Sequence, residues 1–116
     1  MTAITLPYPP SANRYWRVWQ GRPVKSDEAR AYQALVALKC HSEAMRPLVG
    51  QVSVTVSVYR PAKRGDLDNS LKVLLDALKG HAYLDDKQVT RIVAEQHDDK
   101  ARPRVEVEIL ERAVAP

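Results

Sequence analysis

The chain has 116 residues, a formal net charge of +4 and a hydrophobic fraction of 45%. This length predicts one domain over residues 1–116, because two separate cores would each bury too little surface to offset the entropy of folding. The single cysteine, Cys40, excludes an internal disulfide, and no apolar run approaches the roughly 20 residues that span a bilayer. We therefore expect a cytoplasmic protein with no membrane partner, and its positive charge favours polyanionic ligands without requiring them.

Apolar periodicity predicts two helices and four strands, an α+β fold in which both helices pack on a mixed sheet. In chain order we expect a strand at residues 4–8, a helix from 27 to about 45, a strand at 51–59, a helix from about 67 to 79, and strands at 90–96 and 105–110. The last two strands are expected to pair with each other as a hairpin.

Three local signals set the limits and faces of these elements. Ser26 is expected to cap the first helix, because its hydroxyl can accept a hydrogen bond from a free amide of the first turn. Gly80 is expected to end the second helix in the left-handed conformation. The strand at 51–59 alternates valine with polar residues, which places four valines on one buried face: Val52, Val54, Val56 and Val58.

The stretch from Ser11 to Lys25 has no clean periodicity, but it interleaves cations with aromatic rings. Such a stretch can stack on bases and contact phosphates, since every base has a π face and cations pair with the backbone. It can equally be a loop that Tyr15 and Trp16 fold over the core. The sequence pattern leaves both interpretations open.

Acidic residues gather around the second predicted helix. Asp66 and Asp68 lie at its start, where two carboxylates one residue apart can converge on one cation. Magnesium prefers oxygen ligands and usually takes one or two carboxylates together with water and substrate phosphate. Asp85 and Asp86, in the next loop, are candidates for a third ligand. The alternative is structural, because carboxylates also cap helices, favour the helix dipole and form turns.

A positively charged surface is expected around these carboxylates, because an anionic substrate would otherwise be repelled. The candidates for this surface are Lys63, Arg64, Lys100, Arg102 and Arg104. Together with the interleaved stretch, this surface makes Arg14, Tyr15, Arg17, Lys63 and Arg64 the candidates for contacts with DNA.

Taken in order, several short motifs resemble the RusA family of Holliday junction resolvases, which are crossover junction endodeoxyribonucleases. The motifs are Leu6 to Pro10 followed by Ser11, Asn13 and Arg14; Asp66, Leu67, Asp68 and Asn69 with Lys72; Asp76, Ala77 and Leu78; and Leu84, Asp85 and Asp86 with Gln88 and Val89. The resemblance runs nearly end to end, and the ordered set is specific although each motif is short. One departure is Gly65, which interrupts the basic run that often precedes the first aspartate of the family.

The resemblance implies that Asp66, Asp68 and Asp86 are the catalytic carboxylates and hold Mg²⁺, and that Lys72 assists them. It also implies a homodimer that acts on four-way DNA junctions, because two symmetric nicks need two active sites related by a twofold axis. Spacing alone also allows Lys72 to form no more than a solvated pair with Asp76.

Two other functions are compatible with the sequence. The first is a noncatalytic basic module that binds branched or single-stranded nucleic acid and uses its aspartates only as caps. The second is a magnesium nuclease without junction preference, which would cut flaps, forks and plain duplex at similar rates. Metal dependence separates the first from a resolvase, and the range of substrates separates the second.

Overall fold

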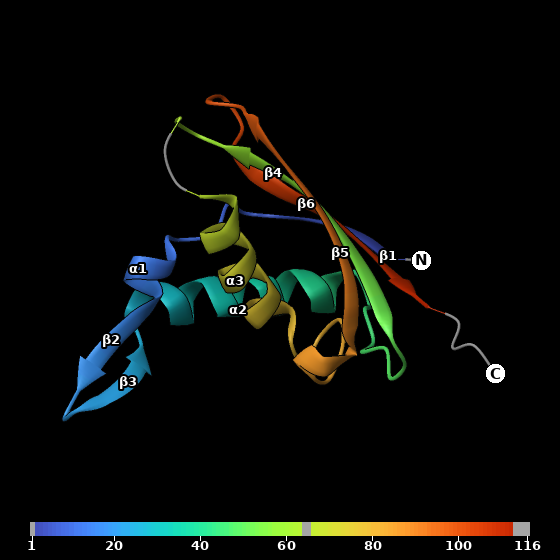
Figure 1. The fold of residues 1–116 in the computed structure, drawn as a ribbon, viewed down its shortest axis with the longest axis horizontal. Coiled ribbons are helices and arrows are strands. Elements are labelled where there is room, and N and C mark those ends of the chain that lie inside the picture. The colour runs from blue at the N-terminus through green and yellow to red at the C-terminus, as the bar shows by residue number, and fades with distance from the viewer. Residues whose placement is uncertain (1, 64–65, 113–116) are drawn as a thin grey trace.

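The computed structural model describes residues 2–63 and 66–112 (Figure 1). Its elements in chain order are β1 (Thr2–Leu6), α1 (Ala12–Tyr15), β2 (Trp16–Trp19), β3 (Arg22–Lys25), α2 (Asp27–Ser42), β4 (Val52–Arg60), α3 (Leu67–Leu78), the 3₁₀ helix η1 (Asp86–Gln88), β5 (Val89–Asp98) and β6 (Arg104–Glu111). The predicted fold class, helices packed on a mixed four-stranded sheet, is confirmed. The short helix α1 and a second sheet, formed by β2 and β3, were not predicted.

The four-stranded sheet has the order β1-β6-β4-β5. β6 pairs antiparallel with both β1 and β4, whereas β5 pairs parallel with β4. The predicted hairpin of the last two strands is therefore wrong, because β4 lies between them. β4 is the strand with the most apolar inner face and takes a central place, whereas β5, with exposed Arg91 and Glu95, suits an edge.

The core lies on one face of this sheet, which α2 and α3 cover (Figure 1). The four valines of β4 are at most 1% exposed, so the predicted buried face is confirmed. The helices contribute the buried residues Ala29, Tyr32, Val36 and Cys40 from α2, and Val73, Leu74, Ala77 and Leu78 from α3. No helix in residues 2–63 and 66–112 is long and apolar enough to cross a membrane.

Both predicted helix limits that depend on one residue are confirmed. The Ser26 hydroxyl accepts a hydrogen bond of 3.1 Å from the Ala29 amide at the start of α2. Gly80 has a φ of 90°, which is the left-handed conformation expected after α3. α2 ends at Ser42, earlier than expected. Ala44 has a φ of 55°, which a residue inside a right-handed helix does not adopt.

The stretch with no periodicity forms the β2–β3 hairpin, which projects away from the sheet and helices (Figure 1). Its turn residues Gln20 and Gly21 have φ values of 50° and 73°. Two consecutive positive φ values define the type of two-residue turn that matches the twist of a hairpin. Gly21 was therefore the sequence signal for this element, although glutamine is an unusual first residue for such a turn.

Candidate active site

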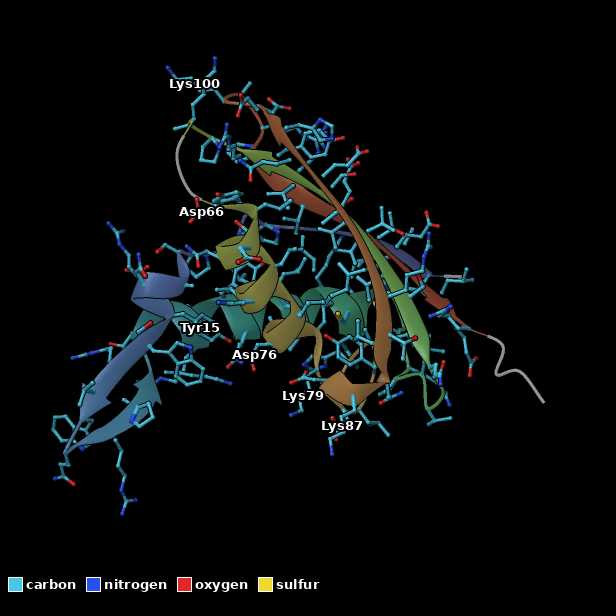
Figure 2. The ribbon with its side chains drawn as sticks, viewed as in Figure 1. Tyr15, Asp66, Asp76, Lys79, Lys87 and Lys100 are labelled. Carbon is cyan, nitrogen blue, oxygen red and sulfur yellow. The ribbon has the colours of Figure 1, made fainter. Side chains whose placement is uncertain are left out.

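Helix α3 carries Asp66 and Asp68 at its start, and Figure 2 shows Asp66 where the chain enters the helix. Asp66 occupies the N-cap position, but its side chain makes no capping hydrogen bond within the described part of the chain. Asp68 is exposed in the first turn, and Lys72 is exposed about one turn further along. The carboxylate of Asp66 therefore makes no capping hydrogen bond to a described residue, and its place at the helix start suits the helix dipole.

The two residues of the tandem Asp85–Asp86 have different environments. The Asp85 side chain accepts a hydrogen bond of 3.0 Å from the Lys87 amide, and the Gln88 side chain accepts one of 2.9 Å from the Asp85 amide. This reciprocal arrangement is a capping box at the start of η1. Asp86 belongs to η1 and lines a cavity instead.

Lys72 and Asp86 line the same cavity, which has a volume of about 600 Å³ and is bounded by α1, α3 and residues of β5. Asp76 lines it as well. The Tyr83 hydroxyl, also at this cavity, donates a hydrogen bond of 2.6 Å to the Leu75 carbonyl. Burial raises the pKa of Tyr83, and the charges of Asp86 and Asp76, which line the same cavity, raise it further.

A second cavity, of about 710 Å³, is lined by Asp66 and Arg14. Asn13 and Asn69 line both cavities, so the two adjoin across α1 and α3. The structure thus places Asp86 and Lys72 in one cavity and Asp66 in its neighbour. Asp68 lines neither, although it lies on α3 between the residues that do.

The donor chemistry of these residues fits magnesium, because carboxylate and amide oxygens are the ligands it prefers. The described residues include no group of three His, Cys, Asp or Glu side chains close enough to hold a metal ion together. Magnesium usually takes one or two protein carboxylates and completes its shell with water and substrate phosphate. The described carboxylates could therefore supply one or two of the ligands of a magnesium ion, but they do not form a closed metal cage.

Asp76 has a structural role that the sequence did not reveal. Its Oδ2 accepts a hydrogen bond from the Tyr15 hydroxyl and another, of 3.0 Å, from Gln33 Nε2. The same oxygen pairs with Lys25 Nζ at 3.1 Å. The partner of Asp76 is therefore Lys25 and not the solvated Lys72 of the alternative interpretation. These contacts come from residues far apart in sequence, which local spacing cannot show.

The structure gives the expected DNA contacts different degrees of access. Arg14 is exposed beside the second cavity, Arg17 is exposed on β2, and Lys63 is exposed in the loop after β4. Tyr15 is only 2% exposed, so its ring offers no open face to a base and acts on the site through Asp76. Arg64 lies outside the described residues.

Arg104 departs from the expected basic surface. Its guanidinium pairs with Asp99 at 2.9 Å and with Glu106 at 3.0 Å, and it lies 3.8 Å from the centre of the Tyr59 ring. Arg104 is thus engaged within the sheet region. Lys100 and Arg102, which are exposed, stay candidates for contacts with an anionic ligand.

Comparison with known proteins identifies one family. The model of the family described as endodeoxyribonuclease RusA matches residues 7–110. The crossover junction endodeoxyribonuclease RusA of Escherichia coli strain K12 is 43% identical over 91 residues, which cover 75% of each chain. The proteins of the same name from Enterobacteria phage 82 and Shigella sonnei strain Ss046 are each 42% identical, over 74% and 75% of each chain.

Proposed function

Because the chain belongs to the endodeoxyribonuclease RusA family, we propose that it is a magnesium-dependent endonuclease that resolves four-way DNA junctions by paired, symmetric nicks. The observation that carries the proposal is the division of roles within the tandem: Asp85 caps η1, whereas Asp86 lines a cavity with Lys72. A structural role explains Asp85 alone. Asp86 is thereby left for a ligand, at the position where the resemblance expects the third carboxylate.

The three carboxylates, Lys72 and Asn69 have distinct chemical roles in this proposal. Asp66, Asp68 and Asp86 would hold Mg²⁺, which when bound polarises the scissile phosphate and lowers the pKa of an attacking water. Lys72 would hold its ammonium beside the phosphate oxygens and stabilise the negative charge that develops there. Asn69, on the wall between the cavities, can donate a hydrogen bond from its amide to a phosphate oxygen.

We also propose a homodimer, because symmetric nicks across a junction need two active sites related by a twofold axis. β4 cannot supply the contact, since it lies inside the sheet and its valines are buried. α2 is the better candidate, because Leu35 and Leu38 are 50% and 66% exposed on it. Sedimentation equilibrium should show a dimer for the wild type and dissociation for Leu38→Glu. A wild-type monomer at micromolar concentration would exclude the dimer.

The second candidate function is a noncatalytic module that binds branched nucleic acid. The observation that favours it is the lack, within the described residues, of three metal-binding side chains close enough to act together. In this case the protein would bind junctions equally well with magnesium or with a chelator and would cut them under neither condition. Asp66 gives it no support, because its side chain makes no capping hydrogen bond to a described residue.

The deciding experiment incubates a labelled four-way junction, or a linear duplex of matched sequence, with purified protein in magnesium or in chelator. The variants are Asp68→Asn and, as a matched control, Asp27→Asn. Asp27 is also an exposed aspartate in the first turn of a helix, but it pairs with Arg30 away from the cavities. Asp68→Asn is expected to abolish cleavage while junction binding persists or tightens, because one negative charge no longer repels the phosphates.

The proposal is supported if paired nicks appear only in the four-way junction and only with magnesium. They should be made by the wild type and Asp27→Asn and not by Asp68→Asn. Normal cutting by Asp68→Asn would exclude this carboxylate from the site. Tight binding without nicks under any condition would identify the noncatalytic module. Equal cutting of junction and duplex would identify a magnesium nuclease without junction preference.

A further inference from the structure

The β2–β3 hairpin has two faces, and each carries a tryptophan beside a cation. Trp16 pairs across the strands with Lys25, whose ammonium lies 5.9 Å from the centre of the indole ring. Trp19 pairs across the strands with Arg22 and lies on the opposite face, because the side chains of a strand alternate. Arg17, two residues before Trp19, shares its face. Arg17, Trp19 and Arg22 are called the tip face below.

The tip face is open to solvent. Trp19 is 65% exposed, and Val18, on the opposite face, is 79% exposed. Large apolar side chains at the end of a two-stranded ribbon bury little surface within the chain, and exposed groups of this kind are typical of binding sites. Within the described part of the chain, Arg22 forms no ion pair, so its charge is uncompensated beside the indole ring.

The base of the hairpin is fixed to the body of the protein. The Ser26 hydroxyl donates a hydrogen bond of 2.5 Å to the Arg14 carbonyl, and the Ser26 amide donates one of 2.9 Å to the Tyr15 carbonyl. Tyr15 and Lys25 both reach Asp76 on α3, and Figure 2 shows Tyr15 and Asp76 together at this base. An isolated hairpin is marginally stable in water, so these contacts hold it in a defined direction.

The tip face lies within reach of a DNA strand that occupies the candidate active site. Trp16, at the base of β2, lines the cavity that contains Lys72 and Asp86. Trp19 lies roughly 10 Å beyond Trp16 at about 3.3 Å per strand residue. This distance is about three base steps at 3.4 Å per base along one strand. Because Trp19 lies on the opposite face of the ribbon from Trp16, a DNA strand with a phosphate in the cavity has to pass around the end of the hairpin before one of its bases meets the tip face.

We propose that the tip face binds unpaired bases at the branch point of a DNA junction, with the Trp19 ring stacked on a base and Arg17 and Arg22 on the flanking phosphates. This inference rests on the proposed function, because its ligand is branched DNA. Stacking on an aromatic ring is independent of base sequence, since every base has a π face. Bases in a linear duplex already stack on each other, whereas a branch point offers open faces. The tip face thereby distinguishes branched from linear DNA.

The chain provides its own reporter for this contact. Its two tryptophans are Trp16 and Trp19, so in Trp16→Phe all tryptophan emission comes from Trp19. This variant is titrated in chelator, where no cleavage occurs, with a four-way junction and with a linear duplex of matched sequence. Stacking on a base is expected to quench the emission with the junction, and the duplex is expected to leave it nearly unchanged.

The second measurement is junction affinity in the same buffer for Trp19→Ala, Trp19→Phe and Val18→Ala. Loss of one base-stacking ring should weaken binding roughly 5-fold to 150-fold. Trp19→Phe retains a ring and should recover most of the affinity. Val18→Ala is the matched control, because Val18 is equally apolar and exposed but points to the opposite face. Its junction affinity should stay within about 2-fold of wild type, the level of an ordinary surface substitution.

Junction nicking by the wild type in magnesium is scored in the same preparation, so the two proposals fail separately. If the wild type nicks junctions but Trp19→Ala and Val18→Ala bind them with equal affinity, the stacking role is overturned and the nuclease stays in place. The same holds if duplex and junction quench the Trp19 emission equally. Junction-specific quenching without nicking would support the stacking role and remove the nuclease. A change of Trp19 emission with protein concentration alone would assign the tip face to a second copy of the chain and overturn the inference.

Discussion

The hydroxyl of Tyr15 donates a hydrogen bond to Oδ2 of Asp76, and this contact joins the base of the β2–β3 hairpin to helix α3. The same oxygen accepts from Gln33 of α2 and pairs with Lys25 of β3. Helices α1, α2 and α3 and the hairpin therefore meet at one carboxylate oxygen. Because Asp76 also lines the cavity with Lys72, the hairpin and the candidate active site share a support.

Tyr15→Phe should weaken this support without removing a core ring. The variant loses one hydrogen bond to a charged group, which contributes about 1.5 kcal/mol, while Lys25 and Gln33 still bind Asp76. Urea unfolding measures this loss, and tryptophan anisotropy should fall because the hairpin moves more freely. Tyr59→Phe is the control, since the Tyr59 hydroxyl makes no hydrogen bond to a described residue. Unchanged stability and anisotropy in Tyr15→Phe would show that the contact supports nothing.

The buried tyrosines should make the fold sensitive to alkali. Burial raises the pKa of Tyr32 well above its ordinary 10.0, and its hydroxyl donates a hydrogen bond to the Pro7 carbonyl. Above pH 10 the unfolded chain releases this proton while the folded chain keeps it, so the free energy of unfolding falls as pH rises. The slope per buried tyrosine approaches about 1.4 kcal/mol per pH unit.

Urea titrations between neutral pH and pH 11 would measure this slope for the wild type and Tyr32→Phe. The variant should be less stable by a constant amount below pH 10, because it lacks the bond to Pro7. Above pH 10 the unfolding free energy of the variant should fall less steeply with pH than that of the wild type, by the contribution of one buried tyrosine. Identical slopes for the two proteins would exclude Tyr32 as a source of alkaline instability.

The tandem aspartates should separate stability from activity. Asp85→Ala loses the cap of η1 and is expected to cost about 1 kcal/mol of unfolding free energy, while junction nicking persists once the protein is folded. Asp86→Asn should keep the unfolding free energy and lose nicking. Thermal unfolding and single-turnover nicking of both variants test the pair. The reverse pattern, with nicking lost only in Asp85→Ala, would reassign the third carboxylate.

Lys72→Met should slow the nicking step about 100-fold, as expected for removal of one group that stabilises the charge of the transition state. Junction affinity should change much less, because one of many cations is lost. The control is Lys79→Met, since Lys79 is exposed at the end of α3 and lines neither cavity described above. Equal rates for the two variants under single-turnover conditions would remove Lys72 from the chemistry.

The parts of the fold that were predictable from sequence depend on a few adjacent residues. The buried valines of β4, the Ser26 cap and the turn at Gly80 each follow from a local pattern and a known backbone preference. The order of strands does not, because β4 pairs with β5 along one edge and with β6 along the other, and neither pairing follows from a local pattern. A short loop between two strands favoured a hairpin, but the apolar inner face of β4 placed it between them.

The candidate site divides in the same way. The residue types and spacing around α3 suggested Asp66 and Asp68 as metal ligands, whereas the resemblance added Lys72 and selected Asp86 over Asp85. That Asp85 is a cap and Asp86 faces a cavity depends on the path of one loop in space. The contacts of Asp76 with residues 61 and 43 positions away leave no trace in local spacing.

The place of β6 in the sheet has a consequence for protein synthesis. β1 leaves the ribosome before the other strands of the described sheet, and its partner β6 is the last of those strands to be made. β1 therefore waits without a partner while α2, β4, α3 and β5 are translated. The sheet that supports α3 is completed only when Arg104–Glu111 emerges, so a nascent chain cannot hold the candidate nuclease site in its final form before that point.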